Sequence, residues 1–253
     1  MCFHLIRSLA QNVLFGPNNL NVIVAYVLLL HWLKNGLRSR KEYQMAQHEA
    51  QLITDGLFLG PHQVAQSREA LEGLQVNSVL SVLGENQDFD KVAVPPQNKI
   101  WVQVTDRVEA EDDMRAALPD AVQQLGAWDV EEKKTLVHCQ SGISRSATVV
   151  IAFMMKHRGM KLMEAYRAVW ERRPAINPND GFFRVLQDYE MTHCGVTKGE
   201  GGRDADTREY NAFQLVSQLA FAGLTLQQCR DALVAADGDV QFAASSLLES
   251  TGM

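Results

Sequence analysis

One stretch near the middle of the chain constrains its fold most strongly, because a β-prone run leads through a cysteine loop straight into an apolar segment. Residues 134–137 are the β-prone run, and residues 147–155 are apolar over a length that suits a buried helix. Cys139 lies between them, at a strand-to-helix turn. The free N–H groups and the positive dipole end of a helix favour an anion, either a phosphate or a thiolate. The stretch therefore predicts an anion-binding turn at the end of a strand.

Four residues in this turn point to a definite chemistry. Cys139 is the candidate nucleophile, because a helix N-terminus and cationic neighbours lower a thiol pKa and the thiolate is the attacking form. Gly142 lets the backbone turn tightly, so that N–H groups can point at phosphate oxygens. Arg145 can hold two phosphate oxygens at once and stabilise charge in the transition state. Ser146 adds a hydroxyl that can donate to the sulfur, and the whole pattern favours a cysteine-dependent phosphatase over a buried, inert cysteine.

The rest of the loop is expected to bind phosphate or to support its binding. His138 precedes the cysteine on the strand, where neighbouring side chains point to opposite faces, so we expect it to orient the loop from behind rather than act as a base. The loop side chains other than Arg145 are uncharged, which leaves no second cation for a polyphosphorylated headgroup and favours phosphoproteins as substrates. The predicted phosphate-binding residues are Gln140, Ser141, Gly142, Ile143, Ser144 and Arg145.

Residues 138–146 resemble the signature of the dual-specificity branch of the protein tyrosine phosphatase superfamily, which is His-Cys, five residues, then Arg and Ser or Thr. The resemblance covers roughly residues 51–191, a normal single-domain length. It implies an α/β fold with a mostly parallel central sheet flanked by helices. It also implies phosphorylated protein substrates, a cysteinyl-phosphate intermediate, and neither metal nor cofactor. The other segments that carry it are 55–60, 76–82, 100–106, 159–165, 172–179 and 181–182.

Such a mechanism needs an acid that protonates the leaving oxygen, and Asp106 is the candidate. It follows an alternating apolar run, and by resemblance it occupies the general-acid position of the family. Asp112 and Asp113 compete for this role, but they precede a segment that is typical of a helix, where an acidic first turn is ordinary. Asn179 is expected to brace the loop by hydrogen bonds, with a purely structural turn role after Pro178 as the alternative.

Composition narrows the functional classes. A net charge of −6 argues against non-specific nucleic-acid binding. The four cysteines lack paired or zinc-type spacing, and the seven histidines show no metal-binding pattern. This usage fits a reducing, cytoplasmic environment better than a disulfide framework. With 253 residues, of which 46% are hydrophobic, the chain can form more than one domain.

The chain changes character after the catalytic segment. Residues 192–206 are glycine-rich and charged, which predicts a flexible linker that leaves the C-terminal segment without firm docking. Residues 207–250, the tail, show three short helical patterns, with Thr225 and Asp239 as suitable N-caps. The tail resembles a ubiquitin-associated domain, a three-helix bundle, which implies ubiquitin as a partner. The implied contact residues are Ala222, Gly223, Leu224, Leu247 and Leu248, with Ala222 and Leu224 in place of the usual methionine and aromatic residue.

The N-terminal residues 1–50 combine an apolar segment with basic charge. Residues 20–33 are strongly apolar, yet a bilayer-spanning helix needs about 20 residues. The basic residues gather after this segment, whereas a secretory peptide carries its positive charge mainly before it. Three interpretations stay open: a membrane anchor that leaves the catalytic domain in the cytoplasm, an organelle-targeting peptide, or a helix docked on the phosphatase.

Two functional classes also stay open. The first is an active phosphatase whose tail directs it to ubiquitin-bearing partners, and the second is an adaptor that binds phosphate and ubiquitin without catalysis. The complete set of Cys139, Arg145, Ser146 and Asp106 favours the enzyme. Within the enzyme class, phosphotyrosine and phosphoserine/threonine proteins are the preferred substrates, with lipid and glucan phosphates as rivals.

Overall fold

The computed structural model describes residues 48–84, 89–194, 202–219 and 222–251. All of them belong to the second of two compact units, which spans residues 42–253. The apolar segment 20–33 lies outside the described residues, so its three interpretations stay predictions. Across the described ranges, none of the helices combines the length and apolarity that a membrane crossing needs.

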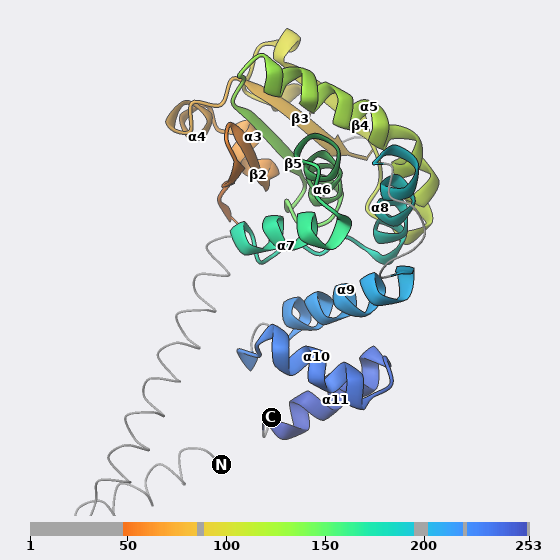
Figure 1. Ribbon diagram of the computed structural model, residues 1–253. Coiled ribbons are helices and arrows are strands. Elements are labelled where there is room, and N and C mark those ends of the chain that lie inside the picture. Colours follow the sequence, from red (N-terminus) through yellow and green to blue (C-terminus); the bar gives the residue numbers. More distant parts are fainter. Residues whose placement is uncertain (1–47, 85–88, 195–201, 220–221, 252–253) are drawn as a thin grey trace, which may run out of the picture. The chain divides into compact units, whose positions relative to one another are not determined.

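The described part of the catalytic domain is built on one sheet of five strands. These are β1 (Gln51–Thr54), β2 (Leu57–Pro61), β3 (Ser78–Leu83), β4 (Lys99–Gln103) and β5 (Thr135–Cys139). Their order is β1-β2-β5-β3-β4, with β5 at the centre (Figure 1). β5 pairs in parallel with β2 and β3, β4 pairs in parallel with β3, and only β1 runs antiparallel to its neighbour. The predicted mostly parallel sheet is therefore confirmed.

The resemblance implies strands over 55–60, 76–82 and 100–106, and each has different bounds in the structure. The second is Ser78–Leu83. The first begins at Leu57, because Asp55 and Gly56 form the turn that joins it to β1. Gly56 has φ +74°, a left-handed conformation that glycine adopts without strain. The strand expected over 100–106 ends at Gln103, so that Asp106 lies on the loop after β4.

The two central strands are buried along their whole length, as expected for a parallel sheet covered on both faces. Their side chains alternate between a larger and a smaller core. Val137 of β5 and Leu80 of β3 belong to the larger core, whereas Leu136 belongs to the smaller one. Cys139 is the last residue of β5 and lies on the side of the larger core.

Helices cover both faces of this sheet (Figure 1). On the larger core, α6 (Arg145–Arg158) contacts α5 (Glu111–Val130), α7 (Leu162–Arg172) and α8 (Asp180–His193). Because α6 begins directly after the cysteine loop and is buried from Arg145 to Met155, the loop rests on a fixed helix end. The smaller core is bordered by α3 (His62–Gln66) and α4 (Arg68–Gly73). Short 3-10 helices occupy Phe89–Lys91, Pro96–Asn98 and Val108–Ala110.

Three helices form the tail: α9 (Gly202–Gln218), α10 (Leu226–Ala235) and α11 (Val240–Ser250). Both predicted N-caps are confirmed. Thr225 Oγ1 accepts a hydrogen bond from the backbone N–H of Gln228 at 3.2 Å, and Asp239 Oδ1 accepts one from Phe242 N–H at 2.9 Å. The helices share a core formed by Ala212, Leu215, Leu219, Ala222, Cys229, Leu233, Ala243 and Leu247.

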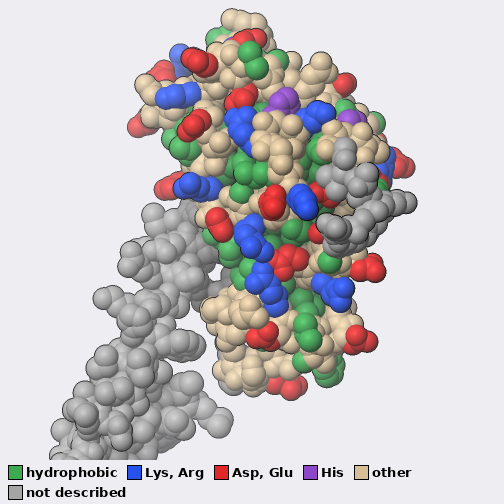
Figure 2. Space-filling view, viewed as in Figure 1, with side chains coloured by type: hydrophobic (Ala, Val, Ile, Leu, Met, Phe, Trp, Pro, Cys, Tyr) green, Lys and Arg blue, Asp and Glu red, His purple; other side chains and the backbone are tan. Residues whose placement is uncertain are grey.

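The expectation that the tail would not dock firmly is wrong, because α9 packs on the catalytic domain. This helix begins within the predicted linker, and its Tyr210 and Phe213 are buried in the larger core of the catalytic domain. The Tyr210 ring stacks on Phe183 of α8 with ring centroids 3.9 Å apart. A salt bridge of 2.8 Å joins Arg167 of α7 to Glu209, and Figure 2 shows acidic and basic side chains intermingled on this face of α7 and α9.

Candidate active site

The cysteine loop, residues 139–145, connects the end of β5 to the start of α6. Gly142 has φ +66°, and a Cβ added to it would lie 2.4 Å from the backbone oxygen of Gly60, so the position requires glycine. The backbone N–H of His62 donates to the Gln140 carbonyl at 3.1 Å, which ties the loop to the end of β2. With carbonyls held outward in this way, N–H groups remain on the inner side of the loop for an anion.

Arg173 holds the same loop from behind and is fully buried. Its Nε donates to the Gly142 carbonyl at 2.7 Å, and its Nη2 donates to the Ser141 carbonyl at 2.9 Å. Nη1 donates to the Glu49 carbonyl at 2.9 Å, which links the loop to the chain before β1. The sequence reasoning missed this role, because nothing local distinguishes Arg173 from its exposed neighbour Arg172.

The Cys139 thiol lies at the floor of the loop, with 1% of the residue exposed. Burial by itself raises a thiol pKa, but the opposing interactions are stronger here. The Ser146 hydroxyl donates to Sγ at 3.2 Å, Arg145 contributes positive charge, and the backbone N–H groups of Ile143 and Ser146 also bind the sulfur. Together they lower the pKa of Cys139, which favours the nucleophilic thiolate.

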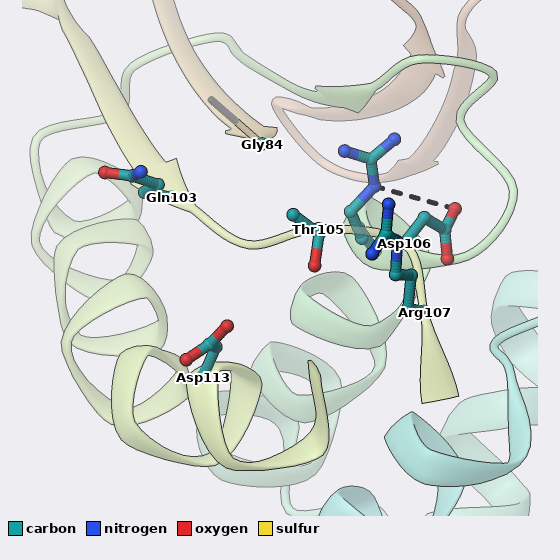
Figure 3. Close-up of a pocket in the computed structure, with 7 residues that line it drawn as sticks. Gly84, Gln103, Thr105, Asp106, Arg107 and Asp113 are labelled. Atoms are coloured by element: carbon teal, nitrogen blue, oxygen red, sulfur yellow. Dashed lines mark ion pairs between the residues drawn. The ribbon is translucent and has the colours of Figure 1, made fainter. Parts of the chain in front are cut away.

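Asp106 lies at the rim of the loop on the segment that follows β4. Its Oδ1 accepts a hydrogen bond from Ser144 Oγ at 2.7 Å and a longer one from Asn179 Nδ2 at 3.3 Å. Its Oδ2 forms an ion pair of 3.5 Å with Nε of Arg145, drawn in Figure 3. Arg145 also donates from Nη1 to the Val104 carbonyl at 3.3 Å. The carboxylate is thus held beside the cysteine loop by three side chains: Ser144 and Arg145 from the loop itself, and Asn179 from the N-terminus of α8.

A pocket of about 610 Å³ opens beside this carboxylate (Figure 3). Asp112 and Asp113 both belong to the acidic first turn of α5, as predicted. Asp113 lines the pocket, but Figure 3 shows its carboxylate well apart from that of Asp106. The lining residues are Gly84, Gln103, Thr105, Asp106, Arg107, Asp113 and Arg145.

His138 lies behind the loop and is fully buried. Its Nε2 is 2.7 Å from Ser81 Oγ of β3, and its Nδ1 is 3.1 Å from the Cys139 carbonyl. Burial disfavours the charged imidazolium and lowers the pKa of His138 to about 4. A ring with these partners braces the strand end, and its position makes it a poor candidate for a base.

The depressed pKa of His138 predicts a loss of stability in acid. The unfolded chain protonates a histidine near pH 6.5, whereas the folded protein protonates His138 only near 4. The unfolded state therefore binds more protons between these values, so the stabilisation by neutral His138 is complete above pH 6.5 and is lost as the pH falls toward 4. Between about pH 7 and pH 5 the loss is about 2 kcal/mol.

Urea unfolding of the wild type and of His138→Gln at both pH values isolates this contribution, because the other titrating groups are common to the two proteins. The free energy of unfolding should fall more steeply in the wild type. An equal fall in both proteins would show that His138 titrates normally in the folded state.

The remaining predicted site residues divide into two groups. Asn179 caps α8 through Oδ1, which accepts from the Phe182 N–H at 3.0 Å, so it has the structural turn role; its Nδ2 donates to Asp106, and direct bracing of the cysteine loop stays a prediction. On the tail, Ala222 and Leu247 are buried in the bundle core and offer little surface to a partner. Gly223, Leu224 and Leu248 remain as the accessible part of the predicted surface, whose contact with ubiquitin stays a prediction. Within the described ranges, no group of three or more His, Cys, Asp or Glu side chains is placed to hold a metal ion.

Three features define a cysteine-loop phosphatase site. A buried cysteine ends a central parallel strand, the loop after it turns at a glycine and leads into a helix N-terminus, and an arginine–aspartate pair lies at the rim. The model of the dual specificity phosphatase catalytic domain matches residues 57–192. The chain therefore belongs to the dual specificity phosphatase family and is a protein phosphatase.

Individual relatives agree with this assignment. Human dual specificity protein phosphatase 14 is 36% identical over 143 residues, which are 56% of this chain and 70% of that protein. The crystal structure of human DUSP28 superposes with a TM-score of 0.51 at 32% identity, and the match covers 56% of this chain and 93% of that one. A mouse putative dual specificity phosphatase, solved as a complex with zinc tungstate, gives a TM-score of 0.50 at 30% identity, with 57% and 88% of the two chains covered.

Proposed function

We propose that Cys139 attacks the phosphorus of phosphotyrosine and phosphoserine/threonine residues in proteins and carries the phosphoryl group as a cysteinyl phosphate. The single observation that best supports this is the 3.2 Å hydrogen bond from the Ser146 hydroxyl to the Cys139 sulfur, in a loop that lowers the thiol pKa. Arg145 would hold phosphoryl oxygens through its planar fork, and the N–H groups of residues 140–144 would bind the others.

The proposed cycle has two steps. In the first, the Sγ–P bond forms as the ester P–O bond breaks, and the Asp106 carboxyl gives its proton to the leaving oxygen. In the second, water attacks phosphorus, its proton passes to the Asp106 carboxylate, and the S–P bond breaks. Ser146 then donates to the returning thiolate, which restores the starting hydrogen bond. Asp106 thus acts as acid and then as base, which its position beside the loop allows.

The charges of the loop support this substrate class. Arg145 is already paired with Asp106, and the other side chains of the loop are uncharged, so a headgroup with several phosphates gains no further cation from the loop itself, although Arg107 also lines the adjoining pocket. A phosphotyrosyl peptide, a phosphothreonyl peptide, vesicles with a phosphoinositide, and phosphorylated amylopectin should be compared at equal concentration. Both peptides should be hydrolysed at least about 100-fold faster than the lipid or the glucan. Faster lipid or glucan turnover would contradict the proposal, and no turnover of any of the four would favour the adaptor.

The tail supports a second, finer proposal: a weak ubiquitin-binding surface formed by Gly223, Leu224 and Leu248. The bundle of α9–α11 has the architecture that the resemblance implies, and both leucines are half-buried at its surface. The burial of Ala222 and Leu247 removes apolar contact area, so the affinity should be low.

Ubiquitin binding can be measured with the full chain by titrating it into isotope-labelled ubiquitin and following the amide shifts. Leu224→Asp and Leu248→Asp should each abolish the shifts, because a charge would then have to be buried in the interface. Val234→Asp is the matched control, since this residue is 80% exposed on α10 and lies outside the proposed surface. Shifts that survive both leucine changes, or that fail only with Val234→Asp, would contradict the surface.

We also propose a cytoplasmic location for the catalytic domain. Cys139, Cys194 and Cys229 are all free, and a thiolate nucleophile requires a reducing environment. Fractionation of cells that express the full chain should recover phosphatase activity in the cytoplasm or on the cytoplasmic side of a membrane. Activity protected inside an organelle would contradict this location.

A further inference from the structure

Asn179 lies in a short connection that joins α7 to α8 and reaches the rim of the active site. One end of its side chain accepts the Phe182 N–H at 3.0 Å and the other donates to Asp106 at 3.3 Å. The position of the Asp106 carboxylate therefore depends on where this connection lies. The two residues that flank Asn179, Pro178 and Asp180, form hydrogen bonds with residues outside the catalytic domain.

Those partners are on α9. The Tyr210 hydroxyl donates to the Pro178 carbonyl at 2.7 Å and lies 3.0 Å from Oδ1 of Asp180. Gln214, one turn further along α9, donates from Nε2 to the same Pro178 carbonyl at 3.4 Å and also contacts the Tyr210 hydroxyl. Tyr210 is 2% exposed, so that water cannot readily replace its hydroxyl as the donor.

The start of α8, directly after this connection, also lies close to the segment that follows Asp106. A Cβ on Gly181 would lie 2.5 Å from the backbone oxygen of Val108, which shows how closely the start of α8 approaches the segment that follows Asp106. A shift of the connection would thus reach Asp106 both through Asn179 and through the backbone of Val108.

From these contacts we infer that Tyr210 is a positioning residue for the general acid: its hydroxyl fixes the Pro178–Asp180 connection, which sets Asn179 and so the Asp106 carboxylate. The inference rests on the proposed role of Asp106 and goes beyond it, because it makes the first tail helix part of the catalytic arrangement. Removal of the hydroxyl should slow proton transfer, which matters only for leaving groups that need a proton.

The test is Tyr210→Phe in the full chain, with turnover measured on a series of aryl phosphates of increasing leaving-group pKa. The rate should fall about five- to tenfold for the poorest leaving group and stay within about twofold for the best one. Tyr166→Phe is the matched control. Its hydroxyl is buried in the same aromatic cluster, with the ring 6.0 Å from that of Tyr210, and it has no hydrogen-bond partner among the described residues. It should behave like the wild type.

Asp106→Asn provides the reference that separates this inference from the proposed function. If Asp106→Asn shows no leaving-group dependence, the acid assignment itself fails. If it does, and Tyr210→Phe loses activity equally across the series or not at all, the positioning role is overturned. In an Asp106→Asn background, Tyr210→Phe should cause no further selective loss. Should Tyr210→Phe melt below the assay temperature, Gln214→Met carries the same test, because it removes the second donor to Pro178.

Discussion

Replacement of Cys139 by serine is expected to lower phosphatase turnover by at least about 10⁴-fold. The serine hydroxyl remains protonated in a loop that stabilises a thiolate, and it is a far weaker nucleophile. The loop geometry should survive, because serine is the smaller residue and the contacts of Gly142 and Arg173 do not involve the sulfur. Steady-state turnover of a small aryl phosphate measures the loss.

Cys194→Ser is the control for this change. Burial raises the pKa of the Cys194 thiol, which lies at the end of α8 and away from the loop. This variant should retain full activity. An active Cys139→Ser protein, or an inactive Cys194→Ser protein that is still folded, would contradict the assignment of the nucleophile.

The second large effect is expected for Asp106→Asn, which removes the proton donor but keeps the shape of the side chain. For poor leaving groups the rate should fall about 10²- to 10³-fold, because the leaving oxygen must then depart as an anion. For good leaving groups the loss should be small. The measurement is the slope of log kcat against leaving-group pKa, which should become steeper in the variant.

Asp112→Asn and Asp113→Asn are the matched controls, since both residues lie in the first turn of α5 and Asp113 lines the same pocket as Asp106. Neither should change the slope. A selective loss with Asp113→Asn and none with Asp106→Asn would assign the general-acid role to Asp113 instead. An equal loss of rate across the series in Asp106→Asn would instead mean that this residue only positions the substrate.

The local part of the site could be predicted because consecutive residues encode it. The strand run and the apolar helix around Cys139 have distinct patterns, and they became β5 and α6. Gly142 was singled out for a tight turn, which its φ of +66° bears out. Asp106 required the family resemblance as well, because a loop aspartate has no pattern of its own.

Long-range contacts could not be predicted in the same way. Arg173 binds carbonyls that lie about 30 residues away in the chain, and a buried arginine cannot be told from an exposed one by its neighbours. The packing of α9 on the catalytic domain was missed because its apolar residues contact two different cores. Ala212 and Leu215 face the tail core, whereas Tyr210 and Phe213 face the catalytic domain, and the glycine-rich linker obscured the second face.

The central claim is the covalent intermediate on Cys139, and trapping it tests the account most directly. The full chain is mixed with a phosphotyrosyl peptide, quenched in acid within the first turnover, and digested for mass spectrometry. Ser146→Ala serves as the sensitised variant, because without the hydroxyl 3.2 Å from Sγ the departing thiolate is less stabilised and the intermediate should accumulate. We predict phosphate on Cys139, more of it in Ser146→Ala and none in Cys139→Ser. Phosphate on another residue, or full turnover without any phosphoenzyme in either protein, would contradict the account.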